Sequence, residues 1–371
     1  MTSADATFFI SNEALSRLPG VGDDEVTAEE GEMAKQAGRA YFLNLAGKTG
    51  DSKDKANAAA ENELDIPESM GRYRIFGHQI SPSQPLYKVG DDPDIEGKLN
   101  SLRCDNSLEY SMVVVSAPLS SASVSEMPVA EDEKIVFLLS GGGFASSDSP
   151  FSKLYYLRIS KELGMRVFVS RYSTIPDHAF PRALHDVYTS YNHLVGHCGF
   201  QPKNIVLLAN SAGCNLALGA LQLLKMQGQF MPARCVLVSP LLDLTLSQDS
   251  WRRNLDHCVL PMMPLSEDIC LPRLYFGPSA KKDVDEFTKQ LCHPLLSPLF
   301  CDPTGFPPMQ IQVGDYEVLL DDAKEFEQRA RKANVPVELI IYPQINHYTI
   351  LRGKTQLDKV YGNKKRFFKG F

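Results

Sequence analysis

Short, continuously apolar runs recur from residue 134 onward, and segments with helical spacing separate most of them. The runs are 134–140, 166–170, 205–208, 235–239, 309–313 and 337–342. Apolar runs without polar alternation are typical of strands that are buried on both faces of a sheet. Strands that alternate with helices are joined by right-handed crossovers and lie parallel to one another. The pattern therefore predicts an α/β fold with a mostly parallel sheet flanked by helices.

This alternation of strands and helices is missing in two places, and both are predicted to lie outside the central sheet. Residues 1–100 begin with a polar, acidic and alanine-rich stretch, so we expect an N-terminal extension with a mobile loop at about 47–63. Residues at about 245–291 break the alternation and look like an insertion over the sheet. The main domain is then 101–371, with a helical cap built from the extension and the insertion.

Composition excludes several classes of partner. The net charge of −7 disfavours nucleic acid, because phosphate binding requires a basic surface. No apolar run reaches the roughly 20 residues that span a bilayer, and the first residues lack the features of a secretory signal. The chain has eight cysteines and no CxxC pair, which favours reduced thiols and a cytoplasmic location. The histidines show no trusted metal-ligand spacing, so neither a metal nor another cofactor is expected.

The strongest local signal is a serine between the third apolar run and the helix that follows it. Ser211 has small neighbours on both sides, which permits the sharp turn that raises a nucleophile above a sheet. The free N–H groups at the start of the helix would face the negative charge that develops there. Ala209 replaces the first glycine of the usual Gly-x-Ser-x-Gly motif, and Gly213 supplies the second. Taken alone, an ordinary turn with a helix-capping serine is the alternative.

Three consecutive glycines, residues 141–143, directly follow the first apolar run. Glycine permits positive φ and lets backbone N–H groups approach a ligand closely. The lysine of a phosphate-binding loop and the GxGxxG spacing are both absent, so an oxyanion site is favoured over a nucleotide site. The predicted oxyanion donors are the N–H groups of Gly142, Gly143 and Ala212. A glycine-rich turn without a catalytic role is the alternative.

An acid and a histidine follow the last two apolar runs, in the chain order serine, acid, histidine. His347 would accept the proton of Ser211, and the acid would fix the tautomer of the imidazole and stabilise its charged form. Two acids, Asp315 and Glu317, follow the fifth run, and the position of the run does not decide between them.

Ordered blocks over about residues 130–350 resemble the hormone-sensitive-lipase branch of the α/β-hydrolases, which includes carboxylesterases and steryl acetyl hydrolases. The blocks include SGGGF (140–144), RYSTIPDHAFPRALHD (171–186), ANSAGCNL (209–216), SPLLDL (239–244), SPLF (297–300), 307–322 and YPQINH (342–347). This resemblance implies an α/β-hydrolase fold and ester hydrolysis without a cofactor. It also implies Glu317 as the acid, because the family acid lies two residues before the leucine of a Leu-x-Asp-Asp block.

The elbow and the glycine loop depart from the family pattern at four positions. Ser140 replaces a histidine, Asn210 an aspartate, and Ala209 and Cys214 each replace a glycine. These departures indicate a specialised site, in which we expect Phe144, Asn210 and Cys214 to contact the substrate. The family analogy favours a short acyl group on a bulky apolar alcohol.

Other activities remain open for the same site. It could transfer its acyl group to an alcohol, act as a lyase or cyclase with His347 as base, or serve as a non-catalytic ligand-binding receptor. The intact Ser211, Glu317 and His347 set disfavours the receptor. The expected partner is a small-molecule ester, and a homodimer is the assembly considered. The basic and aromatic tail 364–369 is expected to be a solvated last helix turn, with contact to an anionic membrane as the alternative.

Overall fold

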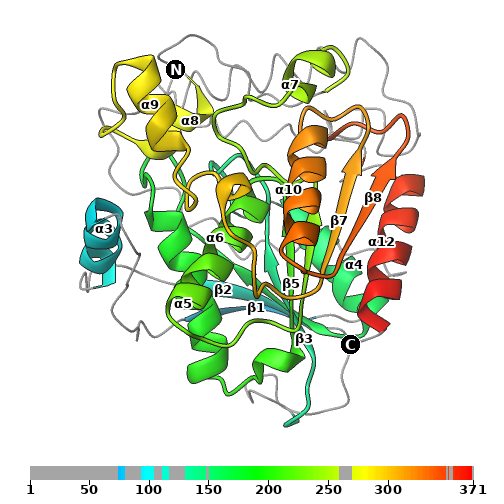
Figure 1. The fold of residues 1–371 in the computed structure, drawn as a ribbon. Helices are drawn as coiled ribbons and strands as arrows, with labels where there is room; N and C mark the ends of the chain where they lie inside the picture. Colours follow the sequence, from blue (N-terminus) through cyan, green and yellow to red (C-terminus); the bar gives the residue numbers. More distant parts are fainter. Residues whose placement is uncertain are drawn as a thin grey trace, which may run out of the picture.

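The computed structural model describes part of the chain, and the structural statements below concern that part. The described residues are 74–79, 93–103, 111–116, 130–147, 150–258, 270–347, 350 and 354–369. The loop predicted at about 47–63 and most of the predicted N-terminal extension therefore lie outside the described residues. The described strands form an eight-stranded sheet in the order β1-β2-β4-β3-β5-β6-β7-β8, which lies at the centre of the molecule (Figure 1).

The strands predicted from the apolar runs are all present and pair in parallel, which confirms the predicted mostly parallel sheet. Every residue of β5 is buried, as expected for a strand covered on both faces. Both neighbours hold the end of β5, since Ala209 pairs with Leu139 and Asn210 pairs with Val238. These strands are β3 (Ile135–Leu139), β4 (Arg166–Ser170), β5 (Ile205–Asn210), β6 (Arg234–Val238), β7 (Met309–Gly314) and β8 (Val337–Tyr342).

Two further strands, β1 (Arg74–Gln79) and β2 (Ser111–Ser116), extend the sheet and are absent from the prediction. β1 pairs antiparallel with β2, and β2 pairs antiparallel with β4. Because β1 lies within residues 1–100, the assignment of that whole stretch to an extension outside the sheet is wrong for this strand. Its sequence, RIFGHQ, has too few apolar residues to be read as a strand buried on both faces. The domain boundary at residue 100 stays a prediction.

The two faces of the sheet bury separate apolar cores. Alternate residues of a strand face opposite sides, so Leu207 and Ala209 belong to one core, and Val206 and Leu208 to the other. Residues of α5, α6 and α10 complete the first core, and residues of α4 and α12 the second. In Figure 1, α10 and α12 flank β7 and β8 on opposite sides. The helices are α3 (Pro93–Arg103), α4 (Pro150–Leu163), α5 (Arg182–Gly196), α6 (Ala212–Met226), α10 (Leu320–Lys332) and α12 (Lys354–Lys369), with 3-10 turns η2 (Pro202–Asn204) and η3 (Pro298–Phe300).

The C-terminal helix α12 is only partly solvated. Lys365 and Arg366 have exposed side chains, as expected for the tail. Lys364 and Phe368 do not, because they lie on the helix face that packs against the second core and are only 1% and 3% exposed. The prediction of a solvated last turn is therefore wrong for these two residues. Within the described part of the chain, none of the helices has the length and hydropathy needed to cross a membrane.

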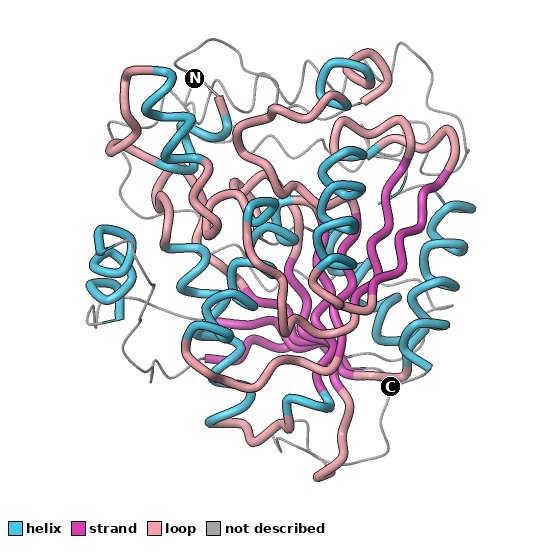
Figure 2. Tube along the Cα trace, in the orientation of Figure 1, coloured by secondary structure: helices cyan, strands magenta, loops and turns pink. Residues whose placement is uncertain are grey.

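The segment predicted as a cap insertion contains three short helices. They are α7 (Ser250–Arg253), α8 (Leu271–Phe276) and α9 (Val284–Leu291). In Figures 1 and 2 these helices lie at the top of the molecule, at the end of the sheet to which β7 and β8 point. Residues 259–269 between α7 and α8 lie outside the described residues. The segment therefore lies at the end of the sheet that a cap would cover, and its role as a cap stays a prediction.

Candidate active site

The predicted nucleophile, acid and base all follow the carboxyl ends of sheet strands. Ser211 comes directly after β5, Glu317 follows β7, and His347 follows β8. Carboxyl ends of parallel strands meet at one edge of an open sheet, which is where such folds bind ligands. The three residues are 3%, 0% and 8% exposed, respectively. The topology therefore gathers residues from distant parts of the sequence at a single buried edge.

The turn that carries Ser211 is strained and tightly held. Ser211 has φ 51° and ψ −122°, a backbone conformation that residues other than glycine rarely adopt. Its N–H donates to the carbonyl of Val238 over 2.9 Å, and its carbonyl accepts the N–H of Cys214 over 2.9 Å. Such strain persists only where the surroundings over-determine the backbone. The turn between β5 and α6 thus has the geometry expected of a nucleophile elbow.

The glycine loop lies directly against this elbow. A Cβ atom on Gly213 would come within 2.4 Å of the Leu139 carbonyl oxygen and 2.7 Å of the Ser140 carbonyl oxygen. A Cβ atom on Gly141 would lie 2.9 Å from the Ser211 Cβ atom. Both approaches are too close for any side chain. The absence of side chains at these two positions therefore brings the loop and the elbow together.

Gly213→Ala is expected to force the elbow and the end of β3 apart. We expect it to destabilise the fold by about 1–3 kcal/mol and to lower kcat/KM for p-nitrophenyl acetate by about 100-fold, because small displacements of reacting groups are costly. Thermal unfolding and ester hydrolysis measure the two effects. Gly196→Ala at the end of α5 is the matched control, since no atom lies within 4 Å of its added Cβ. Wild-type values for Gly213→Ala would contradict this packing.

Two backbone donors of the glycine loop have no hydrogen-bond partner among the described residues. Gly142, Gly143 and Phe144 all have positive φ, of 143°, 57° and 59°. The N–H of Ala145 bonds the carbonyl of Gly142 over 3.0 Å and closes the turn. Within the described residues, the N–H groups of Gly142 and Gly143 make no hydrogen bond, and that of Ala212 begins α6, where no helical acceptor exists. The three predicted oxyanion donors therefore have no hydrogen-bond partner among the residues that the structure describes.

Glu317 is held rigidly against His347. Its Oε2 lies 2.6 Å from His347 Nδ1. Its Oε1 accepts the Ser239 hydroxyl over 2.7 Å and the Gly314 N–H over 2.7 Å. Because both carboxylate oxygens are occupied and the residue is fully buried, the carboxylate fixes the imidazole with Nδ1 as its donor. The other ring nitrogen, Nε2, is then the one that can exchange a proton with a nucleophile.

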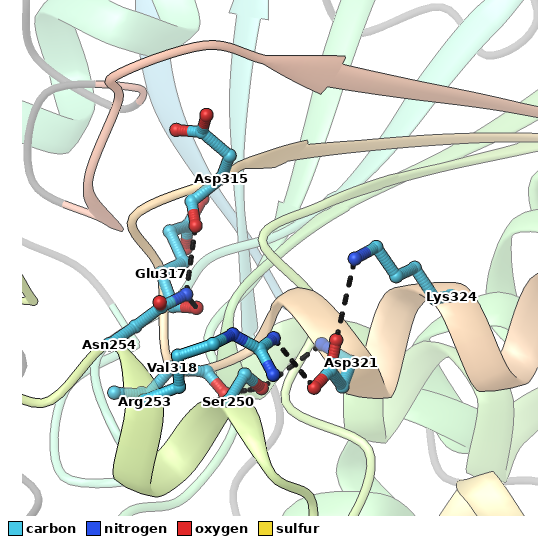
Figure 3. A network of polar contacts seen from close by, with 8 residues as sticks. All are labelled: Ser250, Arg253, Asn254, Asp315, Glu317, Val318, Asp321 and Lys324. Carbon is cyan, nitrogen blue, oxygen red and sulfur yellow. Dashed lines mark hydrogen bonds and ion pairs between the residues drawn. The ribbon is translucent and has the colours of Figure 1, made fainter.

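Asp315, the rival acid, is occupied elsewhere. Its Oδ1 accepts the N–H of Gln344 over 2.6 Å, and Figure 3 shows its carboxylate pointing away from Glu317. Asn254, the residue after α7, holds the backbone of the two acids, since its Nδ2 donates to the carbonyls of Asp315 and Glu317 over 2.8 and 2.7 Å. Ser250 adds a hydrogen bond to the carbonyl of Val318 over 2.5 Å. The geometry therefore favours Glu317.

The connection between Ser211 and His347 is indirect in this structure. No hydrogen bond joins these two side chains within the described part of the chain. They are linked through β6, because Val238 accepts the Ser211 N–H and the next residue, Ser239, bonds Glu317. Catalytic hydrogen bonds are often long before a substrate is bound and tighten in the complex. The structure thus brings Glu317 to His347, with Ser211 on the adjoining turn.

Two tyrosines support the glycine loop where the family pattern has a histidine. The Ser140 hydroxyl hydrogen-bonds the Tyr156 hydroxyl. The Tyr172 hydroxyl donates to the Ser140 carbonyl over 2.7 Å and to the Ser146 carbonyl over 3.2 Å. Both tyrosines are at most 1% exposed, so this support is inside the protein. Sequence reasoning missed the tyrosines because they come from α4 and from the loop after β4.

The three residues predicted to contact the substrate are all buried. Cys214 is fully buried, with Sγ 3.5 Å from the Val238 carbonyl, and Asn210 accepts the Tyr155 hydroxyl through Oδ1 over 3.3 Å. Both side chains are buried and bonded within the protein, and the contact of these two residues with substrate stays a prediction. Phe144 stacks on Tyr275 of α8, with ring centroids 3.7 Å apart. It borders the glycine loop, and its contact with substrate stays a prediction.

Comparisons with known proteins relate this arrangement to esterases. Residues 136–351 match a family model described as the α/β-hydrolase fold. An esterase from Acinetobacter venetianus is 33% identical over 213 residues, which cover 57% of this chain and 66% of that protein. An acetyl-hydrolase from Streptomyces hygroscopicus is 32% identical over 221 residues, covering 59% and 69%. The crystal structure of a hormone-sensitive lipase from a metagenome library, 27% identical, superposes with a TM-score of 0.57 over 70% of this chain and 82% of that one.

Proposed function

Since the chain belongs to the α/β-hydrolase family, in the group similar to hormone-sensitive lipase, and is a carboxylic ester hydrolase, we propose that Ser211, His347 and Glu317 are its catalytic triad. The observation that carries this proposal is the 2.6 Å contact between Glu317 Oε2 and His347 Nδ1. Ser239 and the Gly314 N–H hold the other carboxylate oxygen, so the pair is set before a substrate arrives.

The proposed reaction has two halves. Ser211 Oγ attacks the ester carbonyl carbon while His347 Nε2 takes the hydroxyl proton, and the carbonyl oxygen becomes an oxyanion. The tetrahedral intermediate collapses, the alcohol leaves with the proton from His347, and an acyl ester on Ser211 remains. His347 then removes a proton from water, which attacks the acyl ester, and the acid is released with Ser211 regenerated.

The oxyanion in both halves is proposed to bind the N–H groups of Gly142, Gly143 and Ala212. The lack of a hydrogen-bond partner for these donors among the described residues supports this role, because donors that need not reorganise as charge develops stabilise it best. Loss of one such donor typically costs about 3–4 kcal/mol of transition-state stabilisation. The position of Ala212 at the start of α6 adds the positive end of the helix dipole to this set.

The proposed substrate is a short-acyl ester of an apolar alcohol. The name of the Streptomyces relative, an acetyl-hydrolase, supports a short acyl group. Apolar rings beside the glycine loop support an apolar alcohol, since Phe144 stacks on Tyr275, and Phe180 meets Tyr275 with centroids 5.8 Å apart. The partner is then a small-molecule ester. A homodimer and a cytoplasmic location stay predictions.

A series of p-nitrophenyl esters tests the acyl preference. We expect kcat/KM to fall by about tenfold or more from acetate to octanoate, because each surplus methylene that a short pocket excludes costs on the order of 1 kcal/mol. Naphthyl acetate should be hydrolysed faster than ethyl acetate at equal concentration. When an alcohol is added to the reaction, we expect the free acid to form faster than the new ester that acyl transfer to the alcohol would give. A preference for octanoate would contradict the acyl assignment, and dominant transfer to alcohol would make the protein an acyltransferase.

A further inference from the structure

A lysine of the C-terminal helix is buried close to the nucleophile turn. Lys364 in α12 is 1% exposed, whereas its neighbours Lys365 and Arg366 have exposed side chains that pair with Glu162 and Glu338. Removing an ammonium group from water is costly unless the group is hydrogen-bonded. The contacts of the Lys364 side chain must therefore compensate for the cost of its burial.

Lys364 is joined to the residue before Ser211 by a chain of polar contacts. Its Nζ donates to the Tyr155 hydroxyl over 2.9 Å and lies 5.2 Å from the centre of the Tyr155 ring. The Tyr155 hydroxyl donates in turn to Asn210 Oδ1 over 3.3 Å. Asn210 is the last residue of β5 and directly precedes Ser211, so this chain ends at a side chain beside the elbow serine. Helices α12 and α4 are thereby connected to the residue that precedes the nucleophile.

Both polar departures from the family elbow, Asn210 and Cys214, are buried. Asn210 accepts the end of the chain through Oδ1, and Cys214 Sγ lies 3.5 Å from the Val238 carbonyl oxygen. Burial lowers the pKa of Lys364 to about 7, and burial raises the pKa of Cys214 well above its usual value. A lysine amine keeps N–H donors in both protonation states. The contact with Tyr155 therefore does not depend on a charged lysine.

We propose that Lys364 is a positioning residue, which acts through Tyr155 and Asn210 to hold the turn that presents Ser211. This inference rests on the proposed role of Ser211. The turn needs such support because Ser211 has φ 51°, which relaxes unless neighbouring contacts prevent it. The asparagine suits this role, since its amide oxygen accepts the tyrosine hydroxyl without adding a second charge to the interior. The C-terminal helix then contributes to turnover and not only to the fold.

Lys364→Met and Tyr155→Phe test the proposal, singly and combined. Each is expected to lower kcat for p-nitrophenyl acetate by about tenfold, with KM within about twofold, because a lost hydrogen bond that positions a nucleophile affects turnover more than substrate binding. The double variant should be no slower than the slower single variant, since both substitutions break the same chain. Lys365→Met, an exposed neighbour on α12, is the control and should match wild type.

The rate of Ser211 labelling by a fluorophosphonate separates positioning from mere stability. It should fall with kcat at a temperature well below the unfolding midpoint of each variant. A lowered midpoint with unchanged kcat and labelling, or additive losses in the double variant, would overturn the proposal. If Lys364→Met does not fold, Tyr155→Phe decides, because it removes a single hydroxyl. Unlabelled wild-type protein would instead refute the proposed role of Ser211, which keeps the two failures distinct.

Discussion

Replacement of Ser211 by alanine is expected to lower kcat for ester hydrolysis by about 10⁶-fold, the loss seen when a triad nucleophile is removed. Without the hydroxyl no acyl-enzyme can form, while the oxyanion donors remain and leave a small residual rate. Alanine has no larger side chain than serine, so the elbow should fold as before. Steady-state kinetics with p-nitrophenyl acetate measures the loss, and circular dichroism checks the fold.

The control for this variant is Ser190→Ala, which removes another buried serine hydroxyl, from α5. We expect Ser190→Ala to keep wild-type kcat because its hydroxyl contacts Ser170 and the backbone of its own helix. Wild-type activity in Ser211→Ala would contradict covalent catalysis. If that activity were then lost in His347→Ala, the lyase or cyclase alternative would replace the hydrolase mechanism.

Glu317→Gln is expected to lower kcat by about 10⁴-fold, the size of effect known for amide replacement of a triad acid. The amide no longer stabilises the imidazolium, and its N–H₂ group competes with Nδ1 for the donor role, so His347 is held in the wrong tautomer. The Ser239 hydroxyl and Gly314 N–H would still bond an amide oxygen. Because those anchors remain, the loss should occur in kcat with little change in unfolding temperature.

Asp315→Asn is the matched control for the acid. Its carboxylate bonds the Gln344 N–H near the surface, a contact that contributes to the β7 and β8 loops but not to His347. We expect at most a few-fold change in kcat, which is typical of a partly exposed hydrogen bond. A larger loss in Asp315→Asn than in Glu317→Gln would reverse the assignment of the acid.

The parallel core of the fold could be predicted because its strands are buried on both faces. A strand such as β5 is apolar at nearly every position, so its pattern does not depend on knowing its neighbours. The strand β1 could not be predicted in the same way. Among the described strands it pairs with β2 alone, and its sequence RIFGHQ fits a strand only once that partner is known.

The elbow and its partners could be predicted from local motifs, whereas their supports could not. Ser239, Asn254 and Tyr156 contact the site from elements far away in sequence. No local spacing marks such residues, because the tertiary fold alone brings them to Glu317 or to the glycine loop. In the sequence these three are ordinary polar residues, and their burial becomes apparent only in the folded protein.

Strand and helix periodicity indicates the burial of two polar side chains near the site. Asn210 follows Val206 and Leu208 at a spacing of two, so it shares their face of β5 and faces α4. Lys364 lies four residues after Val360 and four before Phe368, on the buried stripe of α12. For Lys364 the local charge of the tail outweighed the periodicity in the prediction, and the periodicity was the better guide to its burial.

Mass spectrometry of the protein after reaction with a fluorophosphonate tests the central claim most directly. The mechanism predicts one phosphonyl adduct per chain, mapped by peptide sequencing to Ser211 and absent from Ser211→Ala. Loss of p-nitrophenyl acetate hydrolysis should be proportional to the fraction labelled. An adduct on another residue, or full hydrolytic activity in protein that carries the adduct on Ser211, would contradict the assignment of Ser211 as the nucleophile.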